Sequence, residues 1–244
     1  MKRISSLVLA ALLVLALSAC SAAPAPATPT APAPAETPAP SPAASDAPAE
    51  GSASPTASPE ASDASGGILI AYFSVPETDG VDAVAGASRV VVDGAVLGSN
   101  QYVAQLIQAE VGGDLFRIEP ANPYTSDYDA LLDIAQAEQR EDTRPALAAT
   151  VDNWGDYDTI FLGYPVWWYE APQIIKTFAE SYDFAGKTVV PFATSGGSSI
   201  TGTIPAIREL CPGAEFREGL TLDGDRVSSQ LDRIEPWLGE QGAR

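Results

Sequence analysis

Short apolar runs alternate with segments of helical character from residue 67 to residue 238. Five runs predict strands, at residues 67–73, 115–119, 159–162, 187–192 and 216–220. A nearly continuous apolar run of this length is typical of a parallel strand that is buried on both faces. Five further segments predict helices, at residues 100–111, 128–140, 171–181, 203–210 and 227–238. The alternation predicts an α/β fold: a doubly wound five-stranded parallel sheet.

Right-handed crossovers place the carboxyl ends of all parallel strands at one edge of the sheet, where such folds bind ligands. Three segments with unusual composition meet at this edge. After the first strand come Ser74, a long connection, and then Gly98, Ser99 and Asn100, which open the first helix. Hydroxyls and free backbone N–H groups at a helix start suit a phosphate.

The other two segments follow the third and fourth strands. Residues 165–169 read Pro-Val-Trp-Trp-Tyr, and neither a helical nor a strand period can bury all three aromatic residues. They form a candidate wall for a flat ligand. Residues 193–199 read Ala-Thr-Ser-Gly-Gly-Ser-Ser, a loop whose backbone could hydrogen-bond the polar edge of a ring. A phosphate, a flat ring and a polar edge together indicate FMN.

The chain resembles the flavodoxins, in particular a group with a Tyr-Pro-x-Trp-Trp segment and an Ala-Thr-Ser-Gly-Gly-Ser segment. The resemblance covers about residues 67–221 and includes residues 68–74, 116–120, Tyr124 and 181–188. It implies the strand order 2-1-3-4-5 and an FMN site at the switch between strands one and three. It also implies three sets of FMN-binding residues: Ser74, Ser99, Asn100 and Gln101 around the phosphate; Pro165, Val166, Trp167, Trp168 and Tyr169 facing the isoalloxazine; and Thr194, Ser195, Gly196, Gly197 and Ser198 along its other edge.

The phosphate loop departs from the family pattern. Flavodoxins usually continue from the first strand directly into a Ser/Thr-x-Thr-Gly-Asn-Thr loop, whereas this chain inserts residues 75–97 and then reads Gly-Ser-Asn-Gln. The insertion contains Asp93-Gly94 after a valine run and therefore predicts a small β-hairpin. Two interpretations of the insertion stay open: a lid that brings Arg89 near the phosphate, or an addition to the surface.

The N-terminal region predicts export and anchoring. Lys2 and Arg3 precede an apolar run at residues 7–17, and Leu-Ser-Ala-Cys at residues 17–20 resembles a bacterial lipobox. We expect a lipoprotein signal peptide at residues 1–19 and acylation of Cys20; the alternative is an ordinary signal peptide cleaved near Ala19. Residues 20–65, rich in Ala, Pro, Ser and Thr, predict a disordered tether. Residues 66–244 form the flavodoxin-like domain.

The amino-acid composition of the chain argues against several classes of function. The chain contains no histidine, the commonest general base and metal ligand, so triad hydrolases and most zinc chemistry are disfavoured. Its formal charge is −19, and no segment is basic enough to bind nucleic acid. Cys211 is the only cysteine after Cys20, so no disulfide can form within the domain, and its setting before Pro-Gly favours a structural role.

The sequence therefore predicts a membrane-anchored, extracytoplasmic flavodoxin-like protein that binds FMN and takes part in electron transfer. The partner is a redox protein or a small-molecule electron donor or acceptor. Because no separate nicotinamide-binding domain is visible, an electron carrier and a small oxidoreductase both stay open. The alternative is a flavodoxin-fold binding module that has lost or altered its FMN site.

Overall fold

The computed structural model describes residues 66–75 and 89–242. The chain divides into two units, Met1–Ala57 and Ser58–Arg244, and the described residues all belong to the second. The predicted signal peptide at 1–19, the tether at 20–65 with Cys20, and most of the inserted segment, 76–88, lie outside the described residues. Those features stay predictions.

Six parallel strands form the central sheet, and they occupy five positions in it. They run in the order β4-β1-β5-β6, and β7 and β8 both pair with β6 at the far edge. Their bounds are Gly67–Tyr72 (β1), Asp114–Arg117 (β4), Tyr157–Pro165 (β5), Thr188–Ser195 (β6), Glu215–Phe216 (β7) and Leu220–Asp223 (β8). This arrangement confirms the predicted order 2-1-3-4-5, with β7 and β8 sharing the fifth position.

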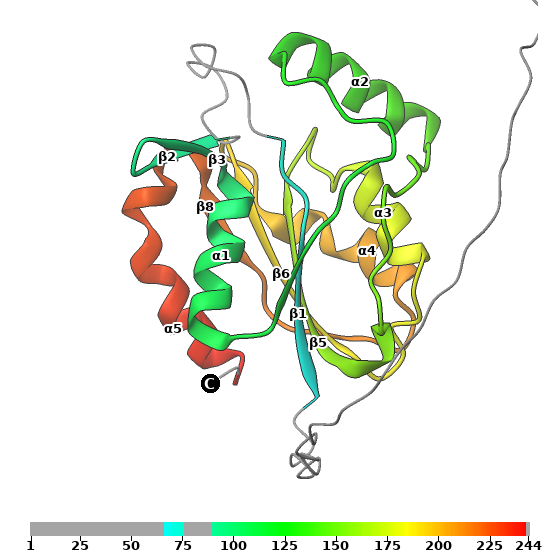
Figure 1. The fold of residues 1–244 in the computed structure, drawn as a ribbon. Helices are drawn as coiled ribbons and strands as arrows, with labels where there is room; N and C mark the ends of the chain where they lie inside the picture. Colours follow the sequence, from blue (N-terminus) through cyan, green and yellow to red (C-terminus); the bar gives the residue numbers. More distant parts are fainter. Residues whose placement is uncertain (1–65, 76–88, 243–244) are drawn as a thin grey trace, which may run out of the picture. The chain divides into compact units, whose positions relative to one another are not determined.

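Two helices cover each face of the sheet (Figure 1). On one face α1 (Ser99–Val111) and α5 (Ile234–Glu240) pack against alternate strand residues such as Ile70 and Phe161. On the other face α3 (Gln173–Glu180) and α4 (Ile204–Leu210) pack against the intervening residues, such as Leu69 and Leu162. The continuous apolar runs follow from this geometry, because both sets of side chains are buried.

The helix α2 (Tyr128–Glu141) lies elsewhere, above the edge at which the strands end (Figure 1). It begins as the sequence predicts: the Asp127 carboxylate accepts a hydrogen bond from the Ala130 N–H at 2.9 Å. Its buried residues, Leu131 and Ala135, belong to neither core cluster. The apolar side of α2 therefore faces the carboxyl edge of the sheet instead of the main core.

The predicted strand at residues 216–220 is wrong in its extent, because two short strands replace it. The carbonyls of Lys187 and Val189 in β6 accept hydrogen bonds from the fifth position. The next residue of β6 on that side is Pro191, which has no N–H to donate. The ladder breaks opposite this proline and resumes at Leu220.

The predicted helix at residues 227–238 is also wrong in its first half. Residues 224–233 form two 3₁₀ segments, Gly224–Ser229 and Leu231–Arg233, and α5 begins only at Ile234. Pro236 explains the late start: it lacks an N–H, and its ring would clash with the carbonyl four residues earlier, so it must lie in the first turn of an α-helix.

The inserted segment contains the predicted hairpin, with strands β2 (Arg89–Val92) and β3 (Ala95–Gly98). Asp93 and Gly94 form its turn with φ of 51° and 80°, as a type I′ turn requires. Val90 is buried in the core cluster that contains α1, and Arg89 pairs with Gly98 at the start of that helix. The hairpin is therefore built into the fold beside the predicted phosphate loop.

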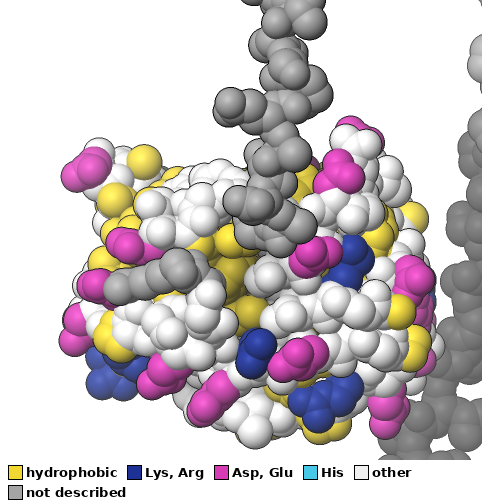
Figure 2. All heavy atoms as spheres, turned by 90° about the horizontal axis from the view of Figure 1, so that it is seen from below, with side chains coloured by type: hydrophobic (Ala, Val, Ile, Leu, Met, Phe, Trp, Pro, Cys, Tyr) yellow, Lys and Arg dark blue, Asp and Glu magenta, His cyan; other side chains and the backbone are white. Residues whose placement is uncertain are grey.

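Charged side chains are mixed on the face at the amino ends of the strands. Figure 2 shows basic side chains lying among acidic ones there, without forming one basic patch. Within the described residues, none of the helices has the length and hydrophobicity to cross a bilayer.

Candidate functional site

The start of α1 carries two buried polar side-chain atoms that have no hydrogen-bond partner among the described residues. Ser99 and Asn100 are each 1% exposed, yet the Ser99 Oγ and the Asn100 Oδ1 have no hydrogen-bond partner among the described residues. A buried polar atom left in this state costs about 1–3 kcal/mol, so such atoms are rare unless a ligand or water satisfies them. Gln101 behaves differently, because its Oε1 accepts a hydrogen bond from the Gly98 N–H at 3.2 Å.

Ser74 lies directly against this helix start. A Cβ atom added to Gly98 would stand 1.9 Å from the Ser74 Oγ, so only glycine permits the approach. Despite the long insertion, the segment that follows β1 therefore contacts the N-cap of α1.

A buried hydrogen bond links this region to the carboxyl end of β6. The Asn100 Nδ2 donates to the Thr194 Oγ1 at 2.8 Å, and both side chains are almost fully buried. The Oγ of Ser195, the last residue of β6, accepts hydrogen bonds from the N–H groups of Gly197 and Ser198 in the following loop, at 3.2 and 2.7 Å. The Ser195 hydroxyl thus fixes the backbone of the loop through these two hydrogen bonds.

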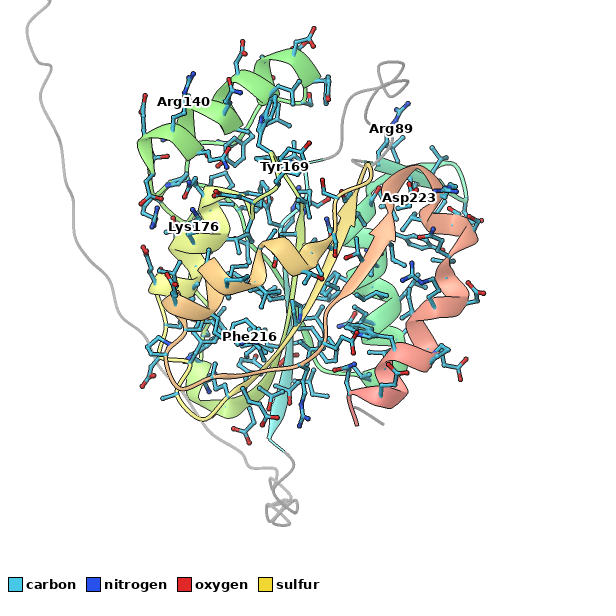
Figure 3. All side chains as sticks on the ribbon, turned by 180° about the vertical axis from the view of Figure 1, so that it is seen from behind. Arg89, Arg140, Tyr169, Lys176, Phe216 and Asp223 are labelled. Carbon is cyan, nitrogen blue, oxygen red and sulfur yellow. The ribbon has the colours of Figure 1, made fainter. Side chains whose placement is uncertain are left out.

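The segment after β5 forms a tight turn at residues 167–170, here called the aromatic turn. Trp167 and Glu170 exchange two backbone hydrogen bonds of 2.9 Å, and Trp168 and Tyr169 adopt φ of 50° and 68°. These features define a type I′ turn built without glycine. The three aromatic side chains diverge: Trp167 packs inward, Trp168 is 42% exposed and Tyr169 is 77% exposed. Figure 3 shows Tyr169 between α2 and the carboxyl edge of the sheet.

A cavity of about 360 Å³, here called the ring cavity, lies between α2, the aromatic turn and the loop after β6. Nine of the predicted site residues line it: Pro165, Val166, Trp167, Trp168, Tyr169, Thr194, Ser195, Gly196 and Ser198. The other predicted residues lie outside its lining: Ser74 and Gly197 border neighbouring hollows, and Ser99, Asn100 and Gln101 stand at the start of α1. Which of them contact a ligand stays a prediction.

The α2 wall of the ring cavity is a part of the site that the sequence analysis missed. Tyr128, Leu131, Leu132 and Ala135 of α2 line the cavity opposite the loop residues. Their spacing of three, four and seven residues marks one face of a helix, so the signal was present in the sequence. The pattern shows that this face is covered but does not show by what.

The ring cavity has an apolar side and a hydroxyl-bearing side. Its described lining residues include no Asp, Glu, Lys or Arg; α2 and the aromatic turn supply apolar surface, and Thr194, Ser195 and Ser198 supply hydroxyls. This arrangement suits a flat, uncharged ring system with one polar edge, and the cavity falls within the size range of small-molecule sites. Glu138, a carboxylate of α2 that does not line the cavity, accepts a hydrogen bond from the Tyr124 hydroxyl.

A doubly wound sheet in this strand order, with a cavity at the carboxyl edge and a polar helix start beside it, is typical of the flavodoxin-like class of proteins. A family model described as flavodoxin matches residues 88–240, which is more than half of the chain. The chain belongs to the flavodoxin family.

Several solved structures are similar to this chain. A protein from Bacteroides eggerthii DSM 20697, classed as a flavoprotein, is 37% identical over 70% of this chain and 98% of its own, with a TM-score of 0.52. A second, from Bacteroides uniformis ATCC 8492 and classed in the same way, is 34% identical over 70% and 98%, with a TM-score of 0.50. A flavoprotein from Lactobacillus acidophilus NCFM, solved in complex with FMN, is 20% identical over 70% and 99%, with a TM-score of 0.48. A search of curated proteins returned no match.

Proposed function

We propose that this protein binds FMN and takes part in electron transfer. The observation that carries the proposal is the pair of buried, unpartnered oxygens, Ser99 Oγ and Asn100 Oδ1, beside the ring cavity, to which Asn100 is joined by its hydrogen bond to Thr194. The Ser99 hydroxyl and the N–H groups of the first turn of α1 can donate to a phosphate. The Asn100 Oδ1 can accept from a ribityl hydroxyl, and Ser74 adds a further hydroxyl.

The residues that line the ring cavity bind the ring of the cofactor. The apolar faces of α2 and the aromatic turn exclude water from a bound ring. The hydroxyls at the end of β6 and in the loop after it can hydrogen-bond the polar edge of that ring. When bound, FMN supplies the redox chemistry, and the protein supplies binding, orientation and electrostatics. No lining residue among those described is a strong acid or base, in keeping with an electron-transfer role.

We further propose that the domain works at the extracytoplasmic face of a cell membrane. Acylated Cys20 would hold it there, with residues 20–65 as the tether. The lipobox-like segment and the Ala/Pro-rich composition support this placement. The electron partner is then a redox protein or a small molecule on the same side of the membrane.

Titration of the purified protein with FMN tests the cofactor proposal. We expect binding with a quenched flavin fluorescence and a shifted visible spectrum, and about 1–3 kcal/mol weaker binding for Trp168→Ala, the range for an aromatic residue against a base-like ring. Val91→Ala, a change at an exposed residue of the hairpin, serves as the control variant.

One observation favours the second candidate, a module with an altered site. The Gln101 Oε1 accepts the hydrogen bond of the Gly98 N–H, so this donor near the predicted phosphate position is already used within the protein. If no FMN binds at tens of micromolar, this candidate replaces the redox function. Gln101→Thr, which restores a hydroxyl and frees that N–H, then distinguishes an altered phosphate site from a lost ring site.

A further inference from the structure

The aromatic turn needs support from outside itself. Trp168 and Tyr169 both adopt positive φ, a conformation that L residues with large side chains rarely take. Strained backbone of this kind persists only where the surrounding structure holds it in place. The two backbone hydrogen bonds within the turn, and the ion pair at 3.2 Å between Glu170 and Lys176 of α3, provide part of that support.

Two aromatic rings, those of Phe73 and Tyr124, fix the position of Trp167. Phe73, Tyr124 and Trp167 form a closed triangle of edge-to-face contacts, with ring centroids 5.3 to 5.6 Å apart. Phe73 follows β1 and is fully buried, so it provides a rigid base. Tyr124 comes from the loop before α2, and its position is set by that loop and by α2.

A hydrogen bond ties Tyr124 to α2. The Tyr124 hydroxyl donates to the Glu138 Oε2 at 2.8 Å, in partly buried surroundings. Burial raises the pKa of Glu138, and burial together with the Glu138 carboxylate raises the pKa of Tyr124, so the phenol keeps its proton. Glu138 lies three residues beyond Ala135 and therefore on the same side of α2 as the wall of the ring cavity.

The other contacts between α2 and the aromatic turn are weaker. The Trp168 Nε1 donates to the Leu132 carbonyl, and the Gln139 Nε2 donates to the Trp168 carbonyl, both at 3.4 Å and both exposed. A short bond to a carboxylate stabilises more than a long exposed one. Of the three links from α2, the one through Tyr124 is thus the strongest, and it reaches Trp167 itself.

We propose that Tyr124 and Glu138 are positioning residues that hold Trp167 and the aromatic turn against α2, and so preorganise the ring cavity for its ligand. The ligand is a flat ring system, and its identity as FMN rests on the proposed function. Loss of the link allows α2 and the turn to separate, so part of the binding free energy must then restore their arrangement.

Three variants test the link in the full chain, and a fourth serves as control. Tyr124→Phe keeps the ring triangle and removes the hydroxyl. Glu138→Leu removes the acceptor, whereas Glu138→Gln keeps an acceptor oxygen. The control is Tyr157→Phe, because the Tyr157 hydroxyl also donates to a carboxylate, Asp114, at 2.8 Å, but at the amino ends of β4 and β5.

Two readouts are measured: the FMN dissociation constant, and the ¹⁹F NMR spectrum of the ligand-free protein labelled with 5-fluorotryptophan, with the Trp167 line assigned from Trp167→Phe. We expect Tyr124→Phe and Glu138→Leu to weaken FMN binding about tenfold and to shift or broaden the Trp167 line, with the Trp237 line unchanged. Glu138→Gln and Tyr157→Phe should stay within about twofold of the parent protein.

An unmoved Trp167 line in Tyr124→Phe would overturn the proposal, as would equal losses of affinity in Tyr124→Phe and Tyr157→Phe, which would indicate general destabilisation. If the parent protein binds no FMN, the proposed cofactor fails. The ¹⁹F spectrum still decides whether Tyr124 and Glu138 position Trp167.

Discussion

Replacement of Tyr169 tests whether the aromatic turn retains backbone strain. Tyr169 adopts φ of 68° and is 77% exposed, so its side chain contributes little packing to the ligand-free fold. We compare Tyr169→Gly with Tyr169→Ala, because both variants lose the same ring and differ in whether a Cβ atom remains. Any difference in stability between them reports on the backbone conformation.

The magnitude follows from two opposing terms. An alanine at this φ pays about 1–2 kcal/mol for the left-handed conformation, and a glycine does not. The glycine loses more entropy on folding, which costs about 0.5–1 kcal/mol. The unfolding free energy of Tyr169→Gly should therefore exceed that of Tyr169→Ala by about 0.5–1 kcal/mol.

Urea unfolding followed by far-ultraviolet circular dichroism measures this difference, with a common slope for both variants. Val91, 60% exposed in the regular strand β2 and outside the positive-φ residues, supplies the matched control pair: there the glycine variant should be the less stable one. Both Tyr169 variants should bind FMN equally weakly, because both lack the ring. A Tyr169→Ala protein as stable as Tyr169→Gly, or more stable, would refute the positive φ at this residue.

Three further predictions follow from individual contacts. Asn100→Ala should weaken FMN binding in a fluorescence titration, because it removes both the buried hydrogen bond to Thr194 and the Oδ1 that is open to a ligand. The raised pKa of Glu138 means that the folded state binds its proton more tightly, so this group stabilises the fold fully below about pH 4.3 and progressively less as the pH rises through the folded-state pKa. Relative to Glu138→Gln, the parent protein should therefore lose stability from pH 4 to 7 in urea titrations, and a difference that does not change with pH would contradict the assignment. Burial raises the pKa of Cys211 to about 12, so this thiol should resist a disulfide reagent at pH 8 in native protein and react once urea unfolds it.

The parallel sheet could be predicted from the sequence because both faces of each central strand are buried, and the apolar runs record that burial directly; the order of its strands was implied only by the resemblance to flavodoxins. The break in the strand pairing opposite Pro191 could not be predicted. It depends on which neighbouring strand lies on the side where Pro191 lacks an N–H, and the register of the sheet determines that. The late start of α5 was visible in Pro236, whose place in a first turn limits how far the helix can extend before it.

The candidate site shows the same division. The residues of the three loops were predicted, because parallel strands bring their carboxyl ends to one edge. The position of α2 against the cavity was not predicted, because the spacing of Tyr128, Leu131 and Ala135 indicates one covered helix face but does not show what covers it. Nor could the divergence of Trp167, Trp168 and Tyr169 be predicted, since it arises from a type I′ turn that sequence preferences disfavour for large residues.

A paired titration with FMN and riboflavin tests the central claim most directly, because the two ligands share the ring and differ in the phosphate. The ring cavity and the polar start of α1 together predict that both ligands bind and that FMN binds at least about tenfold more tightly, as expected for a phosphate held by charge-assisted hydrogen bonds. Equal affinities would contradict the phosphate site at Ser99 and Asn100. No binding of either ligand at tens of micromolar would contradict the flavin site as a whole.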